Sequence, residues 1–150
     1  MNLRRAFLFG IASLLVAGTA GVAAQTMMPA QREALNAAER WLVPVDAERY
    51  ADAWAMASES FKAKVGREEW RDGIRAIRKD YGRVVTRQGE KMAFVGEAPK
   101  ADDPGGPGKV GMQVAILFDT KFVRDRQATE EVMMVLEKDG LWRVAGYHIR

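Results

Sequence analysis

The chain has 150 residues, with 23 basic side chains, 20 acidic ones, a single histidine and no cysteine. A chain of this length is expected to form one domain. The lack of cysteine excludes disulfide bonds, thiol catalysis, cysteine-ligated metal and a lipidated amino-terminal cysteine. A domain without disulfides must rest on its core, and 48% of the residues are hydrophobic.

The first 24 residues are typical of a secretory signal peptide. Arg4 and Arg5 give a basic start, an apolar run follows over residues 6–17, and Val22-Ala23-Ala24 supplies the small residues of a cleavage site. An uncleaved membrane anchor is the alternative, but the run is short and rich in alanine and glycine. We therefore predict cleavage after Ala24, a periplasmic or secreted location, and one mature domain over residues 25–150 with no membrane span.

Removal of the signal peptide changes the charge balance. The segment holds two of the basic residues and none of the acidic ones, so the formal net charge falls from +3 to +1. A chain so close to neutral has no electrostatic argument for binding nucleic acid. We expect no nucleic acid partner.

Apolar residues recur at helical spacing through the first half of the mature chain and predict three helices. The predicted breaks are Pro44 and Asp46 after the first helix, Gly66 after the second and Gly82 after the third. Asp46 is also placed to cap the second helix, because its carboxylate can accept a hydrogen bond from a free backbone N–H.

The second half of the chain predicts strands over residues 83–88, with a continuation over 92–95, and then over 110–122, 130–138 and 141–149. Residues 98–109 are rich in proline and glycine and predict a surface loop. Asp139-Gly140 predicts a two-residue hairpin turn in which both residues have positive φ. Helices followed by antiparallel strands indicate an α+β fold, with helices packed on one face of a sheet.

The last strand predicts which side chains enter the core. Simple alternation places His148 on the same face as Trp142 and Val144. If the helices cover that face, Trp142 is buried and His148 lies at the edge of the core.

The mature chain carries a set of short motifs at residues 38–42, Val45-Asp46, Tyr50, Trp54, Phe61, Trp70, Arg78, Gly82, Arg87, Phe122, Glu131-Val132 and 139–147. These motifs resemble the DUF4019 family, a family of secreted bacterial domains of unknown function. The resemblance extends over nearly the whole mature chain, apart from a longer and more glycine-rich loop over residues 100–108. It implies a cystatin-like or NTF2-like cone, in which three helices pack on a curved antiparallel sheet of about four strands. The family has no agreed activity, so it implies no catalytic residues.

Candidate catalytic and metal-binding residues are few. His148 is a candidate general base, but no carboxylate stands near it in sequence, and we favour a residue at a strand end. Asp102-Asp103 is far from a calcium-loop spacing and indicates a solvated turn. Ser58 and Ser60 lie in a predicted helix without a hydrolase motif. We expect no catalytic residues, no metal and no cofactor.

Four arginines at helical spacing, Arg67, Arg71, Arg75 and Arg78, predict a basic stripe on the third helix. Interleaved carboxylates favour a solvated face, and the alternative is a site for an anion or a lipid headgroup.

Aromatic residues give the remaining candidates. They are more often core than ligand cage, but a cone-like fold can enclose a cavity. The predicted lining of such a cavity is Trp54, Tyr81, Trp142, Tyr147 and His148.

We therefore expect a non-enzymatic binding or accessory domain for a small ligand or an envelope protein. The alternatives are an enzyme that uses His148 with a carboxylate inside the cone, and a protein that self-associates through its sheet. The sequence leaves the oligomeric state open.

Overall fold

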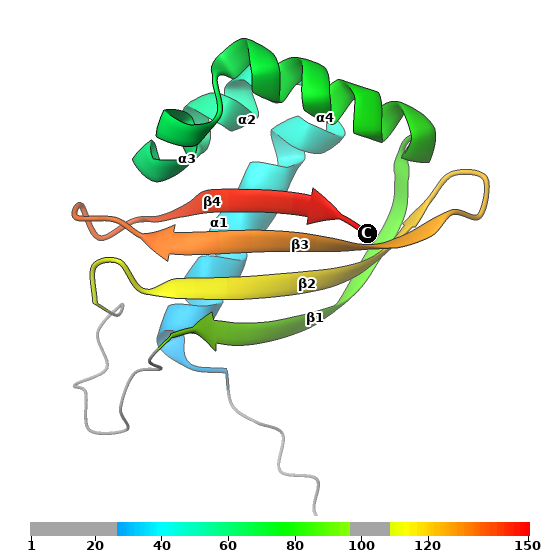
Figure 1. Ribbon diagram of the computed structural model, residues 1–150. Coiled ribbons are helices and arrows are strands. Elements are labelled where there is room, and N and C mark those ends of the chain that lie inside the picture. The colour runs from blue at the N-terminus through cyan, green and yellow to red at the C-terminus, as the bar shows by residue number, and fades with distance from the viewer. Residues whose placement is uncertain (1–26, 97–108) are drawn as a thin grey trace, which may run out of the picture.

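Helices precede strands in the computed structural model, which describes residues 27–96 and 109–150 (Figure 1). The elements are α1 Pro29–Asp46, α2 Tyr50–Met56, α3 Glu59–Lys64, α4 Arg67–Tyr81, β1 Val84–Val95, β2 Gln113–Phe122, β3 Gln127–Leu136 and β4 Trp142–Ile149. The α+β class is confirmed. The predicted signal peptide, the Asp102-Asp103 turn and nearly all of the glycine-rich loop lie outside the described residues.

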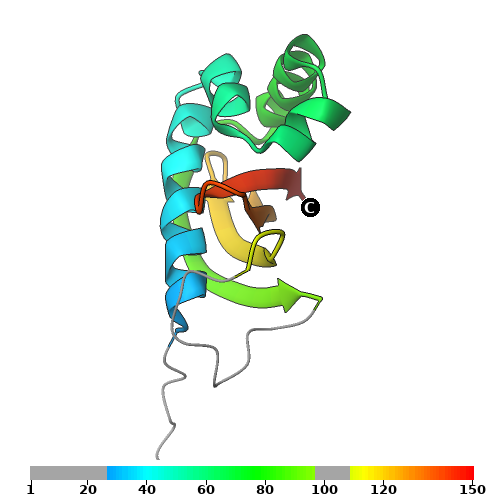
Figure 2. The same ribbon diagram turned by 90° about the vertical axis from the view of Figure 1, so that its left-hand side faces the viewer.

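The strands form one curved antiparallel sheet in the order β1-β2-β3-β4 (Figures 1 and 2). Helix α1 packs against one face, and the shorter helices and α4 lie beyond the β4 edge. The expectation that all the helices cover one face therefore holds for α1 alone. Within the described ranges, no helix combines the length and apolarity needed to span a bilayer.

Helix α1 includes Pro44 and ends at Asp46, within the predicted break. The proline lies in the last turn and is buried, so its missing N–H costs only one intrahelical hydrogen bond. The Arg49 N–H donates to the Pro44 carbonyl at 2.8 Å and closes the turn. Asp46 does not cap the next helix: the N-cap of α2 is Arg49, without a side-chain cap.

The predicted second helix is divided into α2 and α3, so four helices replace the expected three. Ser58 explains the division. Its Oγ accepts from the Phe61 N–H at 3.1 Å as the N-cap of α3, and its own N–H donates to the Val144 carbonyl at 2.9 Å. The break therefore attaches this pair of helices to β4.

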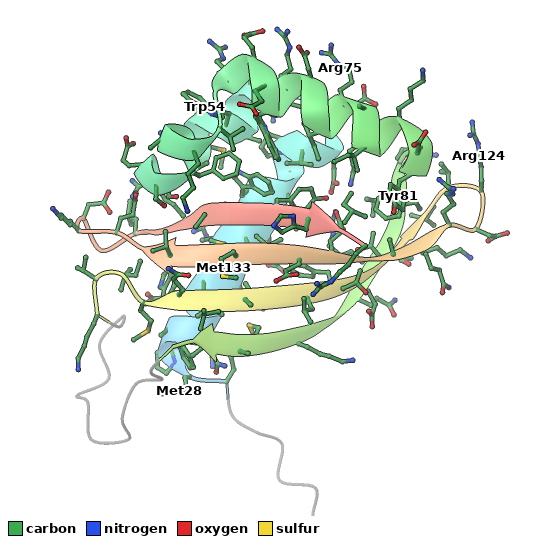
Figure 3. The ribbon with its side chains drawn as sticks, in the orientation of Figure 1. Met28, Trp54, Arg75, Tyr81, Arg124 and Met133 are labelled. Carbon is green, nitrogen blue, oxygen red and sulfur yellow. The ribbon has the colours of Figure 1, made fainter. Side chains whose placement is uncertain are left out.

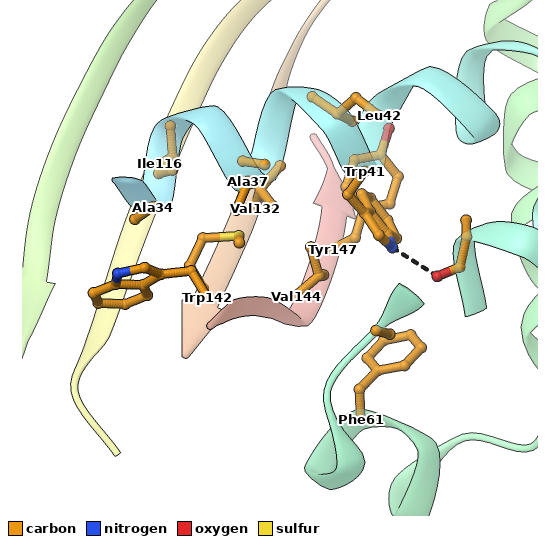
Figure 4. Packing of buried hydrophobic residues seen from close by; sticks show 14 of the residues in the cluster. Ala34, Ala37, Trp41, Leu42, Phe61, Ile116, Val132, Trp142, Val144 and Tyr147 are labelled. Atoms are coloured by element: carbon orange, nitrogen blue, oxygen red, sulfur yellow. Dashed lines mark hydrogen bonds between the residues drawn. The ribbon is translucent and has the colours of Figure 1, made fainter. Parts of the chain in front are cut away.

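The core lies between α1 and the sheet and continues into the other helices through Ala53, Phe61 and Trp70 (Figure 4). Trp41 is 2% exposed, and its indole N–H donates to the Ala53 carbonyl at 2.8 Å, which joins α1 to α2. Trp142 faces the helices and is buried beside Val144, as predicted. Its indole N–H is buried and has no hydrogen-bond partner among residues 27–96 and 109–150.

A β-bulge in β4 overturns the predicted placement of His148. Met134 pairs with Val144, whereas Met133 pairs with Gly146, so Ala145 is an extra residue in β4. The extra residue reverses the alternation beyond it. Tyr147 therefore points into the core, and His148 is exposed.

The β3–β4 hairpin is present, but its turn differs from the predicted one. Gly140 has a φ of 79°, whereas Asp139 is not in the positive-φ region. The Gly140 N–H donates to the Glu137 carbonyl, and the Glu137 N–H donates to the Leu141 carbonyl, both at 3.0 Å. This is the longer hairpin loop in which one left-handed glycine follows a turn.

Candidate functional site

Every strand and two helices contribute one side chain each to a buried polar cluster. The six are Asp46 of α1, Arg78 of α4, Arg87 of β1, Thr120 of β2, Glu130 of β3 and Tyr147 of β4. Two arginines face two carboxylates, so the cluster carries no net formal charge.

Glu130 is the centre of this cluster and is completely buried. It accepts hydrogen bonds from Arg87 Nε at 2.6 Å and from Arg78 at 3.3 Å, and also from the Thr120 and Tyr147 hydroxyls. Asp46 accepts from Arg78 at 2.9 Å and from Arg87 at 2.8 and 3.0 Å. Every carboxylate oxygen in the cluster is engaged, which favours a structural role over proton transfer.

Burial changes the ionisation of two members. It would lower the pKa of Arg87, but hydrogen bonds to Asp46 and Glu130 outweigh it and raise that pKa above the ordinary value. Burial raises the pKa of Tyr147, and the nearby Glu130 charge raises it further. Arg87 therefore stays charged and Tyr147 stays neutral while the chain is folded.

An open groove of about 460 Å³ follows the free edge of β4. Its helical wall is mainly apolar, and one of its members, Ile77, is 47% exposed. Gly73 of α4 also lines it, with no atom within 4 Å of the position a Cβ would take. The helical lining is Phe61, Lys64, Val65, Glu69, Trp70, Gly73, Ile74 and Ile77, and residues 145–149 form the strand side.

The strand side of the groove presents free backbone groups. Thr129 and Arg150 exchange both backbone hydrogen bonds, at 2.7 and 3.0 Å. Bonded pairs alternate along an antiparallel ladder, so His148 is the next residue bonded to β3. The N–H and C=O groups of Tyr147 and Ile149 consequently point away from β3, along the free edge.

The predicted cavity residues are not brought together. Trp54 and Tyr81 lie toward opposite ends of the helical layer (Figure 3). The Trp54 indole donates to the Val65 carbonyl at 2.8 Å, and Tyr81 packs on Phe122.

The other three candidates divide between two surfaces. Trp142 lines a separate hollow beside α1, whereas Tyr147 and His148 both line the β4 groove. Opposite His148 in the ladder stands Glu131, but the carboxylate of Glu131 pairs with Arg150 at 2.7 Å. No group of three or more metal-binding side chains gathers anywhere in the described ranges.

The arginine stripe is solvated except at its last member. Arg67 and Arg75 are exposed, and Arg71 pairs with Glu68 and Asp72. Arg78 is 5% exposed and belongs to the buried cluster, which corrects the prediction of a solvated face at that position.

The cluster and the groove were both missed in the sequence. Glu130 carried one usable signal, since it alternates with Val132 and Met134 on the inward face of its strand. A carboxylate at such a position needs a buried cation. The groove had no such signal, because it depends on where α4 lies relative to the β4 edge.

A solved structure from Catenulispora acidiphila is similar at 15% sequence identity, over 79% of this chain and 88% of that chain, with a TM-score of 0.42. Likeness at this level carries no argument about function. No curated protein matches the chain. A family model described as "Protein of unknown function (DUF4019)" matches residues 37–147, which is more than half of the chain. The chain therefore belongs to the DUF4019 family.

Proposed function

We propose that this protein is an exported, non-enzymatic binding module that docks an extended segment of an envelope protein along β4. The observation that carries the proposal is the pairing of free backbone groups at Tyr147 and Ile149 with an apolar wall on α3 and α4. An added strand would satisfy those groups, and the wall would select its side chains.

The groove defines the chemistry of the partner. Alternate side chains of an added strand point to opposite sides, so every second one would face the wall formed by Trp70, Ile74 and Ile77. Those side chains must be apolar, because a charge placed there would lose its hydration. An open groove beside a strand edge fits a polypeptide better than a small enclosed ligand.

A display library of random 12-residue peptides tests this proposal against the mature chain. We expect enriched peptides with an apolar residue at every second position. Gly73→Leu should abolish their binding because it fills the groove, and it should not harm α4, since leucine forms helices better than glycine. The matched control is Ala76→Leu, an exposed position on the same helix that does not line the groove.

Two results would overturn the docking proposal. One is equal binding of the enriched peptides to Gly73→Leu and to the unmodified chain. The other is a concentration-dependent dimer in sedimentation that Gly73→Leu abolishes, because a second copy would then occupy the β4 edge.

Export has its own test. Arg4-Arg5 and Val22-Ala23-Ala24 support cleavage after Ala24. The intact mass of protein recovered from the periplasm should correspond to a chain that begins at Gln25. Recovery of the full-length mass in the membrane fraction would show an uncleaved anchor instead.

A further inference from the structure

A second hollow, of about 340 Å³, lies where α2, α4 and the start of β1 meet, apart from the β4 groove. Tyr50 of α2 lines it, together with Arg75 and Lys79 of α4 and Arg83 just before β1. Glu48 stands at the same hollow. None of these five side chains takes part in the proposed docking of a segment along β4.

The Tyr50 side chain is the unusual member. The residue is only 3% exposed, yet within the described ranges its hydroxyl makes no hydrogen bond, and it lines the hollow. The hydroxyl is not one of the fully buried polar atoms, so it opens on the hollow and can donate a hydrogen bond to a molecule bound there. Burial raises the pKa of Tyr50, and the Glu48 charge raises it further, so the hydroxyl is held as a donor.

The charges around the hollow favour an anion as that acceptor. Arg78 and Asp46 also line it, but they already pair with each other in the buried cluster. Lys79 and Arg83 have no carboxylate partner among the described residues, and Arg75 approaches Asp72 only at 3.9 Å. Three cations therefore face a single uncommitted carboxylate, that of Glu48.

We propose that this hollow binds a small oxyanion of the phosphate class. The Tyr50 hydroxyl donates to one oxygen, and the Lys79 ammonium and the Arg83 guanidinium neutralise the charge. The phosphate is either free in solution or part of a lipid headgroup, since both present the same oxygens. This site is independent of the docking groove, and each can fail without the other.

Titration of the mature chain with inorganic phosphate, at constant ionic strength balanced with chloride, tests the site. We expect saturable amide shifts over residues 79–83 in proton–nitrogen NMR spectra. Replacing Lys79 and Arg83 together with glutamine should weaken binding at least about tenfold, because charge-assisted hydrogen bonds are lost. Tyr50→Phe should weaken it less while keeping the ring in place.

The matched control replaces Arg32 and Arg67 together with glutamine, which removes two charges from exposed positions of α1 and α4 and leaves the hollow intact. If this control weakened phosphate binding equally, the effect would be one of general electrostatics and the proposal would be overturned. Amide shifts that never saturate would overturn it as well. Phosphatidylglycerol vesicles, compared with phosphatidylcholine vesicles, identify the source. Sedimentation with the anionic vesicles that requires Lys79 and Arg83 assigns a headgroup, and its absence beside saturable phosphate binding assigns a free anion.

Discussion

At the scale of single residues, Glu130 determines whether the buried cluster holds together. Glu130→Gln keeps the shape of the side chain but leaves the buried Arg78 and the partly buried Arg87 with one carboxylate. We expect a loss of about 3–5 kcal/mol in the free energy of unfolding, the usual result of breaking a buried ion pair. Denaturant unfolding measures it, and the exposed-face neighbour Glu131→Gln should cost less than about 1 kcal/mol. Equal midpoints for the two variants would contradict the central role of Glu130.

Trp142 combines a large buried surface with an unsatisfied indole N–H. Trp142→Ala should cost about 3–5 kcal/mol, because it empties an aromatic site in the core. Trp142→Phe should cost clearly less, since it also removes a buried donor whose burial costs about 1–3 kcal/mol. Urea unfolding of both variants tests this, and a phenylalanine as costly as an alanine would show that the indole N–H is hydrated.

At the scale of elements, Ser58 connects the helical layer to the sheet. Ser58→Ala should cost about 0.5–2 kcal/mol, because α3 loses its N-cap while the backbone bond to Val144 remains. Thermal unfolding measures the loss. Ser60→Ala removes a hydroxyl that is hydrogen-bonded to the Ser58 Oγ at 3.0 Å but leaves the Phe61 N–H its acceptor, so it should change stability less. A larger effect there would place the cap elsewhere.

The periodicity of the apolar residues was sufficient to predict the helices and strands. It did not predict the positions where a single residue divides a helix or shifts the register of a strand. The apolar stripes and the alternation predicted helices followed by strands, and both are present. The bulge at Ala145 could not be predicted from the sequence, because an alanine is as compatible with an ordinary strand position as with a bulge. The partners of Asp46 were equally hidden: Arg78 and Arg87 lie 32 and 41 residues away in sequence, so local pattern assigned Asp46 to a cap.

At the scale of the whole molecule, Tyr147 makes stability depend on pH in alkaline solution. Its pKa is raised above 10.0 in the folded chain, so above about pH 10 the unfolded chain loses a proton that the folded chain keeps. Stability should therefore be unaffected by this group below pH 10 and should fall as the pH rises further. Unfolding free energies across this range measure it, and Tyr147→Phe should give a shallower fall. An unchanged slope would show that Tyr147 ionises normally.

The cluster that joins all four strands to α1 and α4 also bears on how fast the chain unfolds. Its ion pairs join residues 32, 41, 43 and 52 positions apart, and closing loops of that length comes late in folding. Contacts that are absent from the folding transition state must be broken before the unfolding chain reaches that state, so they slow unfolding without speeding folding. Arg87→Gln should accordingly raise the unfolding rate in stopped-flow measurements and leave the folding rate nearly unchanged. Slower unfolding lengthens the lifetime of the native state, and a longer-lived native state resists proteases better.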